Sequence, residues 1–135
     1  MTTYANAREY LITKINTAWT TQYPTTRVFY ENTTKVDLDA VGTHFLAVTV
    51  DFTDSMRMEI NPSPSSRTWG EVILRFFAKE GQGTKTVLGM FDYMTAQMKY
   101  ITLTGVELGC PEPGPKRAQG GWVSYDLVVP FFFYQ

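Results

Sequence analysis

Apolar residues recur at helical spacing in two segments of the chain, residues 3–20 and 84–99. In each segment an apolar side chain returns every three or four positions, which places a stripe on one face of a helix. Thr2 or Thr3 is suited to cap the first helix, and Pro24 ends it because proline disfavours helical backbone in the residue before it. We therefore predict two amphipathic helices with the stripes Tyr4, Ala7, Leu11, Ile15 and Ala18, and Val87, Phe91, Met94 and Met98.

Between and after these helices the apolar positions alternate, as the two faces of a β-strand require. The alternation predicts strands over 26–32, 44–52, 56–60, 68–80, 101–109 and 122–133. Proline and serine dominate residues 61–66, and proline and glycine recur in residues 110–121, so we interpret both stretches as loops. The strands cluster instead of alternating with the helices. This order favours a single α+β domain over residues 1–135, with a mostly antiparallel sheet and two helices packed on one face.

The segment 68–80 has apolar side chains on both of its faces. Val72, Leu74, Phe76 and Ala78 point one way, while Ile73 and Phe77 share the other with Glu71, Arg75 and Lys79. An antiparallel sheet with helices on one face is expected to be polar on the other. Either the helices cover more of this sheet than the pattern indicates, or a partner subunit covers the second face.

Composition narrows the classes of partner. A chain of 135 residues suits one domain, and 12 basic against 13 acidic residues give a net charge of −1. No overall field draws such a chain to nucleic acid or to an anionic membrane. The single cysteine, Cys110, forms no internal disulfide, and no signal peptide or membrane-spanning run is evident. We expect neither a membrane nor a specific nucleic acid as partner.

The stretch "EGQGTKT" at residues 80–86 resembles a phosphate-binding loop only superficially. A Walker A loop needs its lysine directly after the last glycine, and here Thr84 separates Gly83 from Lys85. Ala78 stands where the first glycine of that motif belongs. A turn that leads into a helix explains these residues better, because Gly81 and Gly83 suit a turn and Thr84 suits a helix N-cap. We interpret the stretch as a turn into the second helix.

Other chemistry is sparse. His44 is the only histidine, and neither it nor Cys110 stands in a nucleophile motif. Asp37, Asp39 and Gly42 echo a calcium loop but lack its terminal glutamate. The pair Asp51 and Asp54 is not excluded as an acid–base couple, although surface carboxylates are the default interpretation. We expect no catalytic residues, no cofactor and no metal.

The order of elements resembles a family of small phage tail proteins. The likeness lies in the first helix ending at Trp19, "TRVFYEN", "GEVILRFFAKEGQGTKT", "LTGVELG" and the closing "GWVSYDLVVPFFFY". Together these segments cover nearly the whole chain. They resemble the tail terminator, or tail-completion, proteins of long-tailed bacteriophages and their prophage relatives.

The resemblance implies a structural protein without catalytic residues. Its subunits would form a ring, usually a hexamer, that sits on the tail tube protein, stops its polymerisation and faces the head–tail connector. The partners are then further copies of the chain, the tube protein and the connector. The location is the virion, after assembly in the host cytoplasm.

A ring needs unlike patches on each subunit, and the residues suggest where these lie. We predict contacts at Met56, Arg57, Met58 and Glu59, at the 61–66 loop, and at Arg75, Phe77 and Lys79. Lys116 and Arg117 form a small basic spot that is either a solvated loop tip or a contact to the ring lumen or connector.

Other readings stay open at this point. A head–neck adaptor or another minor tail protein of the same fold is a sibling of the terminator hypothesis. A module that binds a small ligand or nucleic acid through residues 110–121 is a different class, and it would need a basic stripe beside stacking aromatics. An enzyme would need a pocket joining His44, Cys110 or paired acids.

Overall fold

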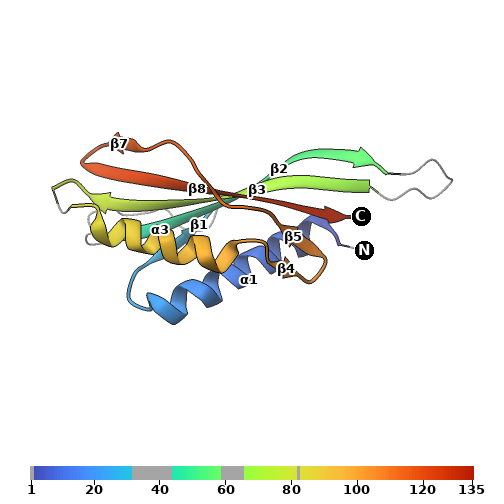
Figure 1. Ribbon diagram of the computed structural model, residues 1–135, viewed down its shortest axis with the longest axis horizontal. Coiled ribbons are helices and arrows are strands. Elements are labelled where there is room, and N and C mark those ends of the chain that lie inside the picture. Colours follow the sequence, from blue (N-terminus) through green and yellow to red (C-terminus); the bar gives the residue numbers. More distant parts are fainter. Residues whose placement is uncertain (1, 32–43, 59–65, 82) are drawn as a thin grey trace.

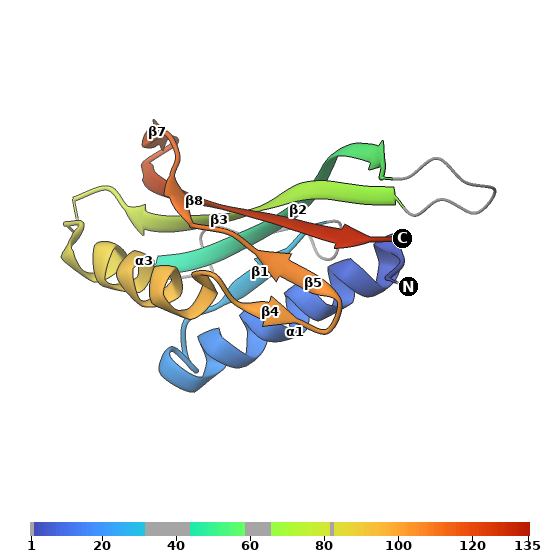
Figure 2. The same ribbon diagram turned by 45° about the vertical axis from the view of Figure 1, so that its right-hand side comes forward.

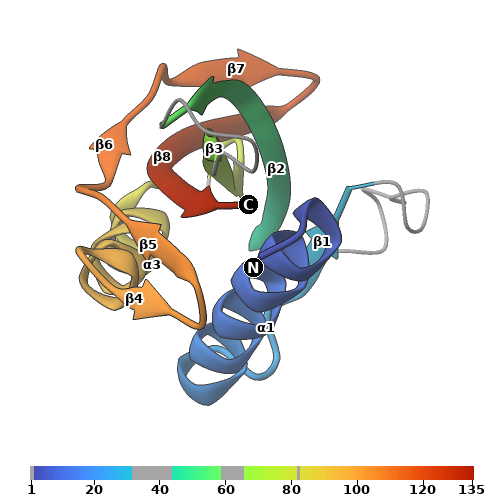
Figure 3. The same ribbon diagram turned by 90° about the vertical axis from the view of Figure 1, so that its right-hand side faces the viewer.

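The computed structural model describes residues 2–31, 44–58, 66–81 and 83–135. These residues form two helices on one face of a curled, mostly antiparallel sheet, so the predicted α+β fold is confirmed (Figures 1 and 3). The helices are α1 (Tyr4–Gln22) and α3 (Lys85–Met98). The strands are β1 (Val28–Tyr30), β2 (His44–Arg57), β3 (Ser66–Lys79), β4 (Thr102–Leu103), β5 (Val106–Leu108), β6 (Glu112–Pro113), β7 (Arg117–Gln119) and β8 (Trp122–Tyr134).

Helix α1 begins at the predicted cap. The side chain of Thr3 accepts a hydrogen bond from the backbone N–H of Asn6 at 3.1 Å. The helix buries the rest of its predicted stripe together with Trp19, while Tyr4 stays exposed. The Trp19 indole N–H donates to the carbonyl of Thr26 at 2.9 Å, which fixes the chain as it leaves the helix.

Helix α3 confirms its predicted span but not its predicted cap. Gly81 and Gly83 adopt left-handed φ values of 86° and 78°, as the turn interpretation requires. Thr84 occupies the N-cap position, yet its side chain makes no capping hydrogen bond. Its backbone is near-helical, at φ −119° and ψ −4°, and an N-cap hydroxyl ordinarily needs an extended residue.

Three long strands form the centre of the sheet. Strand β3 pairs with β2 along one edge and with β8 along the other, both antiparallel, and β1 adds to β2 in parallel. The two strands predicted over 44–52 and 56–60 are one continuous β2 as far as Arg57, a correction to the sequence reading. The register shifts between Phe52 and Asp54, so a β-bulge absorbs the residue that interrupted the alternation.

The predicted loop 110–121 is also partly wrong, because it contains β6 and β7. Both pair with the edge of β8 that β5 also uses, so the chain from β5 to β7 follows β8 back along its length (Figure 2). Gly120 and Gly121 close the β7–β8 hairpin with φ values of 59° and 82°, the backbone that a two-residue turn of this type needs. Pro113 is tolerated in β6 because that strand lies at a sheet edge.

The hydrophobic core lies between the sheet and the helices. Alternate residues of β3, Val72, Leu74, Phe76 and Ala78, are buried there, which confirms the predicted inward face of this strand. They meet Leu46, Val48 and Val50 of β2, the stripe of α1, and Val87, Met90, Met94 and Met98 of α3.

Two glycines give a matched test of this packing. A Cβ at Gly70 would collide with the Asp51 carbonyl oxygen and the Phe131 ring, whereas a Cβ at Gly89 in α3 would meet nothing within 4 Å. We expect Gly70→Ala to lower the free energy of unfolding by about 1–3 kcal/mol. Gly89→Ala should raise it by up to about 1 kcal/mol, since alanine favours helix. Urea unfolding of both variants measures this, and an unchanged midpoint for Gly70→Ala would contradict the packing.

Candidate interaction surface

Aromatic rings from four strands meet on the sheet face that is turned away from the helices. Phe45 of β2 stacks on Phe77 of β3 with centroids 4.4 Å apart. Phe29 of β1 and Trp122 of β8 contact Phe45 edge-on, at 5.6 and 5.1 Å. We call these four residues the aromatic cluster. It accounts for part of the apolar surplus on the second face of β3, because Phe77 is half-buried within its own chain.

A polar cavity lies beside this cluster. It has a volume of about 120 Å³ and is lined by Arg75, Phe77, Arg117, Trp122 and Ser124. We call it the arginine pocket. Asp126 is buried next to it, and its Oδ2 atom lies 3.5 Å from Nε of Arg75 and 3.9 Å from Nε of Arg117.

The register of the strands explains how these charges come together. Arg75 pairs with Asp126 across the β3–β8 ladder, and Arg117 of β7 pairs with Ser124 two residues before Asp126. The buried carboxylate is thus flanked by cations from the strands on both sides of β8. Burial of this charge is tolerable only because of those cations.

The other end of the same face carries exposed apolar groups. Residues 51–57 of β2 pair with the beginning of β3 and lead away from the helical layer, at the end of the molecule where both chain termini lie (Figure 1). We call these paired segments, 51–57 and 66–71, the arm. Met56 is 53% exposed on it, and Met58 just beyond it is 40% exposed.

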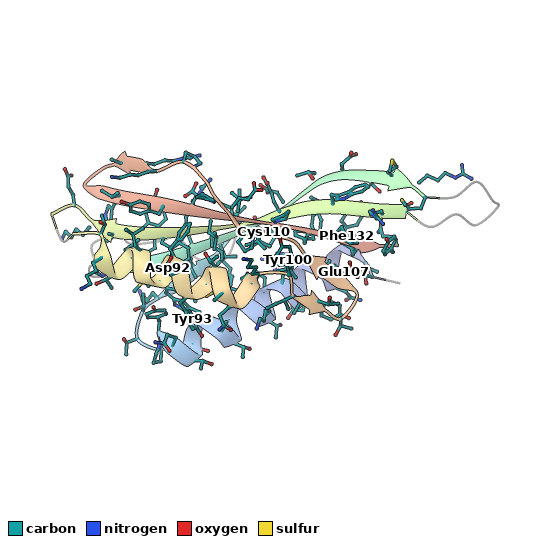
Figure 4. The ribbon with its side chains drawn as sticks, in the orientation of Figure 1. Asp92, Tyr93, Tyr100, Glu107, Cys110 and Phe132 are labelled. Atoms are coloured by element: carbon teal, nitrogen blue, oxygen red, sulfur yellow. The ribbon has the colours of Figure 1, made fainter. Side chains whose placement is uncertain are left out.

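A cation sits among aromatic rings at the base of the arm. The guanidinium of Arg67 lies 4.9 Å from the ring centroid of Phe132, 5.0 Å from Tyr134 and 5.6 Å from Trp69. Figure 4 labels Phe132 at this end of the sheet. Arginine and large aromatic residues are the types that most often dominate binding energy in protein interfaces.

The predicted contact residues that the structure describes lie towards the two ends of the sheet, and not all of them share this face. Met56, Arg57 and Met58 are exposed on or beside the arm, and Lys79 is exposed at the opposite end. Glu59 lies outside the described residues, as does the 61–66 loop apart from Ser66. Arg75, Phe77 and Arg117 meet at the arginine pocket, whereas Lys116 lies over the Tyr125 ring at 5.5 Å.

Sequence reasoning missed the residues that unite these positions. Asp126, Trp122 and Ser124 occupy alternate positions of β8, so alternation alone places them on the same face of that strand. The signal available in the sequence was an aspartate inside a mostly apolar strand segment, "WVSYDLVV". What could not be read from sequence was the register that sets Asp126 against Arg75, because it depends on pairing between distant segments.

His44 and Cys110, which an enzyme would have to bring together, belong to different parts of the sheet. His44 begins β2, while Cys110 follows β5 and lies beside Tyr100 (Figure 4). A hydrogen bond with the side chain of Cys110 raises the pKa of the Tyr100 hydroxyl. Within the described part of the chain, no three His, Cys, Asp or Glu side chains gather to hold a metal ion. The calcium-like residues Asp37, Asp39 and Gly42 lie outside the described residues.

Neither described helix combines the length and apolar character that crossing a bilayer requires.

Comparison with known proteins supports the fold class alone. No family model and no curated protein matches the chain. Among 11 chains of solved structures that match, one superposes with a TM-score of 0.76 at 9% sequence identity. The alignment covers 98% of this chain and 96% of that one. The name of that structure describes no activity, and at this identity the likeness shows a shared fold.

Asp126 is the residue on which the arginine pocket depends. We expect Asp126→Ala to lower the free energy of unfolding by about 2–3 kcal/mol, because it leaves two neighbouring guanidinium groups without their carboxylate. Asp92→Ala on the exposed side of α3 is the control and should change stability by less than about 0.5 kcal/mol. Chemical denaturation of both variants tests this, and equal small effects would show that the pocket charges are not coupled.

Histidine titration gives a pH test. Burial lowers the pKa of His44 below its ordinary value of about 6.5, so the folded state favours the neutral ring. The unfolded chain therefore takes up a proton more readily, and stability falls as the pH drops through this range. We expect the free energy of unfolding to be lower at about pH 5.5 than at about pH 7.5, on either side of the ordinary histidine pKa. In His44→Gln this part of the pH dependence should be lost. If the free energy of unfolding of that variant changes with pH as in the wild type, another group causes the dependence.

Proposed function

We propose that the chain is a structural protein of phage tail assembly, a tail terminator. Its copies form a ring that caps the tail tube protein and joins it to the head–tail connector. It uses no cofactor and catalyses no reaction. It acts in the virion, after assembly in the bacterial host cytoplasm.

One observation carries the proposal: a single sheet face offers two unlike surfaces at its two ends. One end has the exposed Met56 and the rings around Arg67, and the other has the arginine pocket with the exposed Lys79. Unlike surfaces on one subunit are what a head-to-tail contact needs, and such contacts close into rings when the rotation permits.

Two features of the sequence agree with this proposal. The resemblance to tail terminators runs along nearly the whole chain, from Trp19 to the closing "PFFFY". The net charge of −1 favours a protein partner over a polyanion. An exposed apolar group on a sheet face, such as Met56, also favours contact with protein.

The direct experiment is sedimentation velocity from micromolar to millimolar concentration, followed by electron microscopy of the assembled species. We expect a discrete transition from monomer to closed rings with a central opening. Met56→Lys should weaken this assembly because it places a charge in the apolar end of the contact. Leu88→Lys changes an equally apolar residue, 40% exposed on α3, and should leave assembly intact.

Two results would count against the proposal. One is a chain that stays monomeric throughout the concentration range. The other is assembly that Leu88→Lys disrupts and Met56→Lys does not, since this would place the contact on the helical layer.

A further inference from the structure

The arginine pocket holds more positive charge than its own carboxylate neutralises. Arg75 and Arg117 approach the same oxygen of Asp126, at 3.5 and 3.9 Å, so two guanidinium groups share one negative charge. Lys79 is exposed on the same face, four residues after Arg75 on β3, and it adds to the surplus of positive charge. Arg117 is the more accessible of the two arginines, with 57% of its side chain exposed against 35% for Arg75.

The hydrogen bonding of the pocket is incomplete as well. Nε of Arg75 and Oδ1 of Asp126 are buried and have no hydrogen-bond partner within the described ranges. Both distances to Asp126 exceed the roughly 2.7–2.9 Å of a tight charge-assisted hydrogen bond. A guanidinium presents a planar fork of donors that matches a carboxylate, so the cavity between Phe77 and Trp122 suits a carboxylate group.

Two carboxylates stand opposite each other elsewhere on the same face. Asp51 of β2 pairs directly with Glu71 of β3, at the inner end of the arm. Like charges in directly opposite positions destabilise a ladder. No described cation of the same chain is paired with these two carboxylates, so the acidic pair suits an incoming cation.

The two features cannot satisfy each other within one chain. Glu71 and Arg75 point to the same side of β3, but four residues of strand separate them by roughly 13 Å. Arg75 is already turned to Asp126 on the neighbouring strand. Between two copies, by contrast, the acidic pair of one can meet the arginine pocket of the other.

We propose that the arginine pocket of one copy binds the carboxylates of Asp51 and Glu71 of a second copy. The occupant is thus the same chain. The pocket and the acidic pair lie at different places on the sheet face, so a staggered contact leaves one half of each copy free for the next copy, as a head-to-tail assembly requires. This inference rests on the self-assembly in the proposed function and deepens it by naming the charged residues of the contact. It does not depend on what the assembled ring caps.

The variant Asp51→Lys separates a role of Asp51 in the contact between copies from a role in the stability of the single chain. Within a chain the new lysine faces Glu71, so it replaces a repulsion with an attraction and should raise the urea midpoint of the dilute monomer. Between chains it faces Arg75 and Arg117, so it should raise the dissociation constant of self-association about tenfold or more. Asp92→Lys makes the same charge change on α3 and should leave the dissociation constant unchanged.

A complementary change restores the attraction. Arg117→Glu alone should weaken self-association to a similar degree, because its carboxylate faces the acidic pair. An equimolar mixture of Asp51→Lys and Arg117→Glu should assemble again, since every contact in a mixed assembly then joins opposite charges. Sedimentation velocity of each variant and of the mixture measures this. Circular dichroism checks that Arg117→Glu is folded, and Asp51→Lys, which leaves the pocket intact, carries the test if it is not.

The possible failures are distinguishable. A wild-type chain that never associates overturns both this contact and the proposed ring. A wild-type chain that associates while Asp51→Lys matches the wild type overturns the contact and leaves the ring. A third result would be that the pocket binds glutarate only when Arg117 is present, while Asp51→Lys and Arg117→Glu self-associate like the wild type. This result would assign the pocket to a small carboxylate and overturn the proposal.

Discussion

The pairing of β3 along both of its edges is the constraint on which the rest of the structure depends. From Arg67 to Ala78 this strand has β2 on one side and β8 on the other. Its side chains therefore point to one face of the sheet or the other, and none lies at a free edge. Two helices cover one side. The other side must be covered by the chain itself, by solvated polar groups or by another molecule.

The chain divides that second side into regions of different character. At one end, aromatic rings from four strands bury each other, and Asp126 is neutralised by arginines from the strands on either side of β8. Further along, Asp51 and Glu71 stand opposite each other, and beyond them Arg67 lies among three rings. Each end leaves charge or apolar surface uncompensated, and the two ends are unlike. That asymmetry is the physical basis for proposing head-to-tail assembly.

Local pattern was sufficient for most of the fold. The inward face of β3 and most of both helical stripes were predicted correctly, because burial imposes its period on the sequence wherever one face packs on a core. The exceptions are Tyr4, which is exposed, and Phe91, which is only half-buried. The errors came where the pattern of apolar positions does not decide the outcome. The proline-rich stretch before Gly120 pairs with β8 because that edge is available, and Thr84 lacks its capping bond because its backbone is near-helical.

The candidate surface was only half predictable for the same reason. Arg75, Phe77 and Arg117 were singled out by residue type and face, and the structure brings them to one cavity. Asp126, which organises their charges, needed the β3–β8 register, and no local signal in the sequence sets that register. The contact between copies stays a prediction that charge and geometry motivate.

Zero-length carbodiimide cross-linking of a mixture of isotopically light and heavy protein tests the central claim most directly, because it joins only carboxylates and amines already in contact. In an Arg117→Lys variant, which keeps the charge of the pocket and supplies an amine, we expect mixed-isotope links between the peptides that contain Asp51 or Glu71 and the peptide that contains position 117. Mixed-isotope links confined to lysines of the helical layer, such as Lys14 and Lys99, would contradict it, because they would place the contact between copies on the opposite side of the sheet.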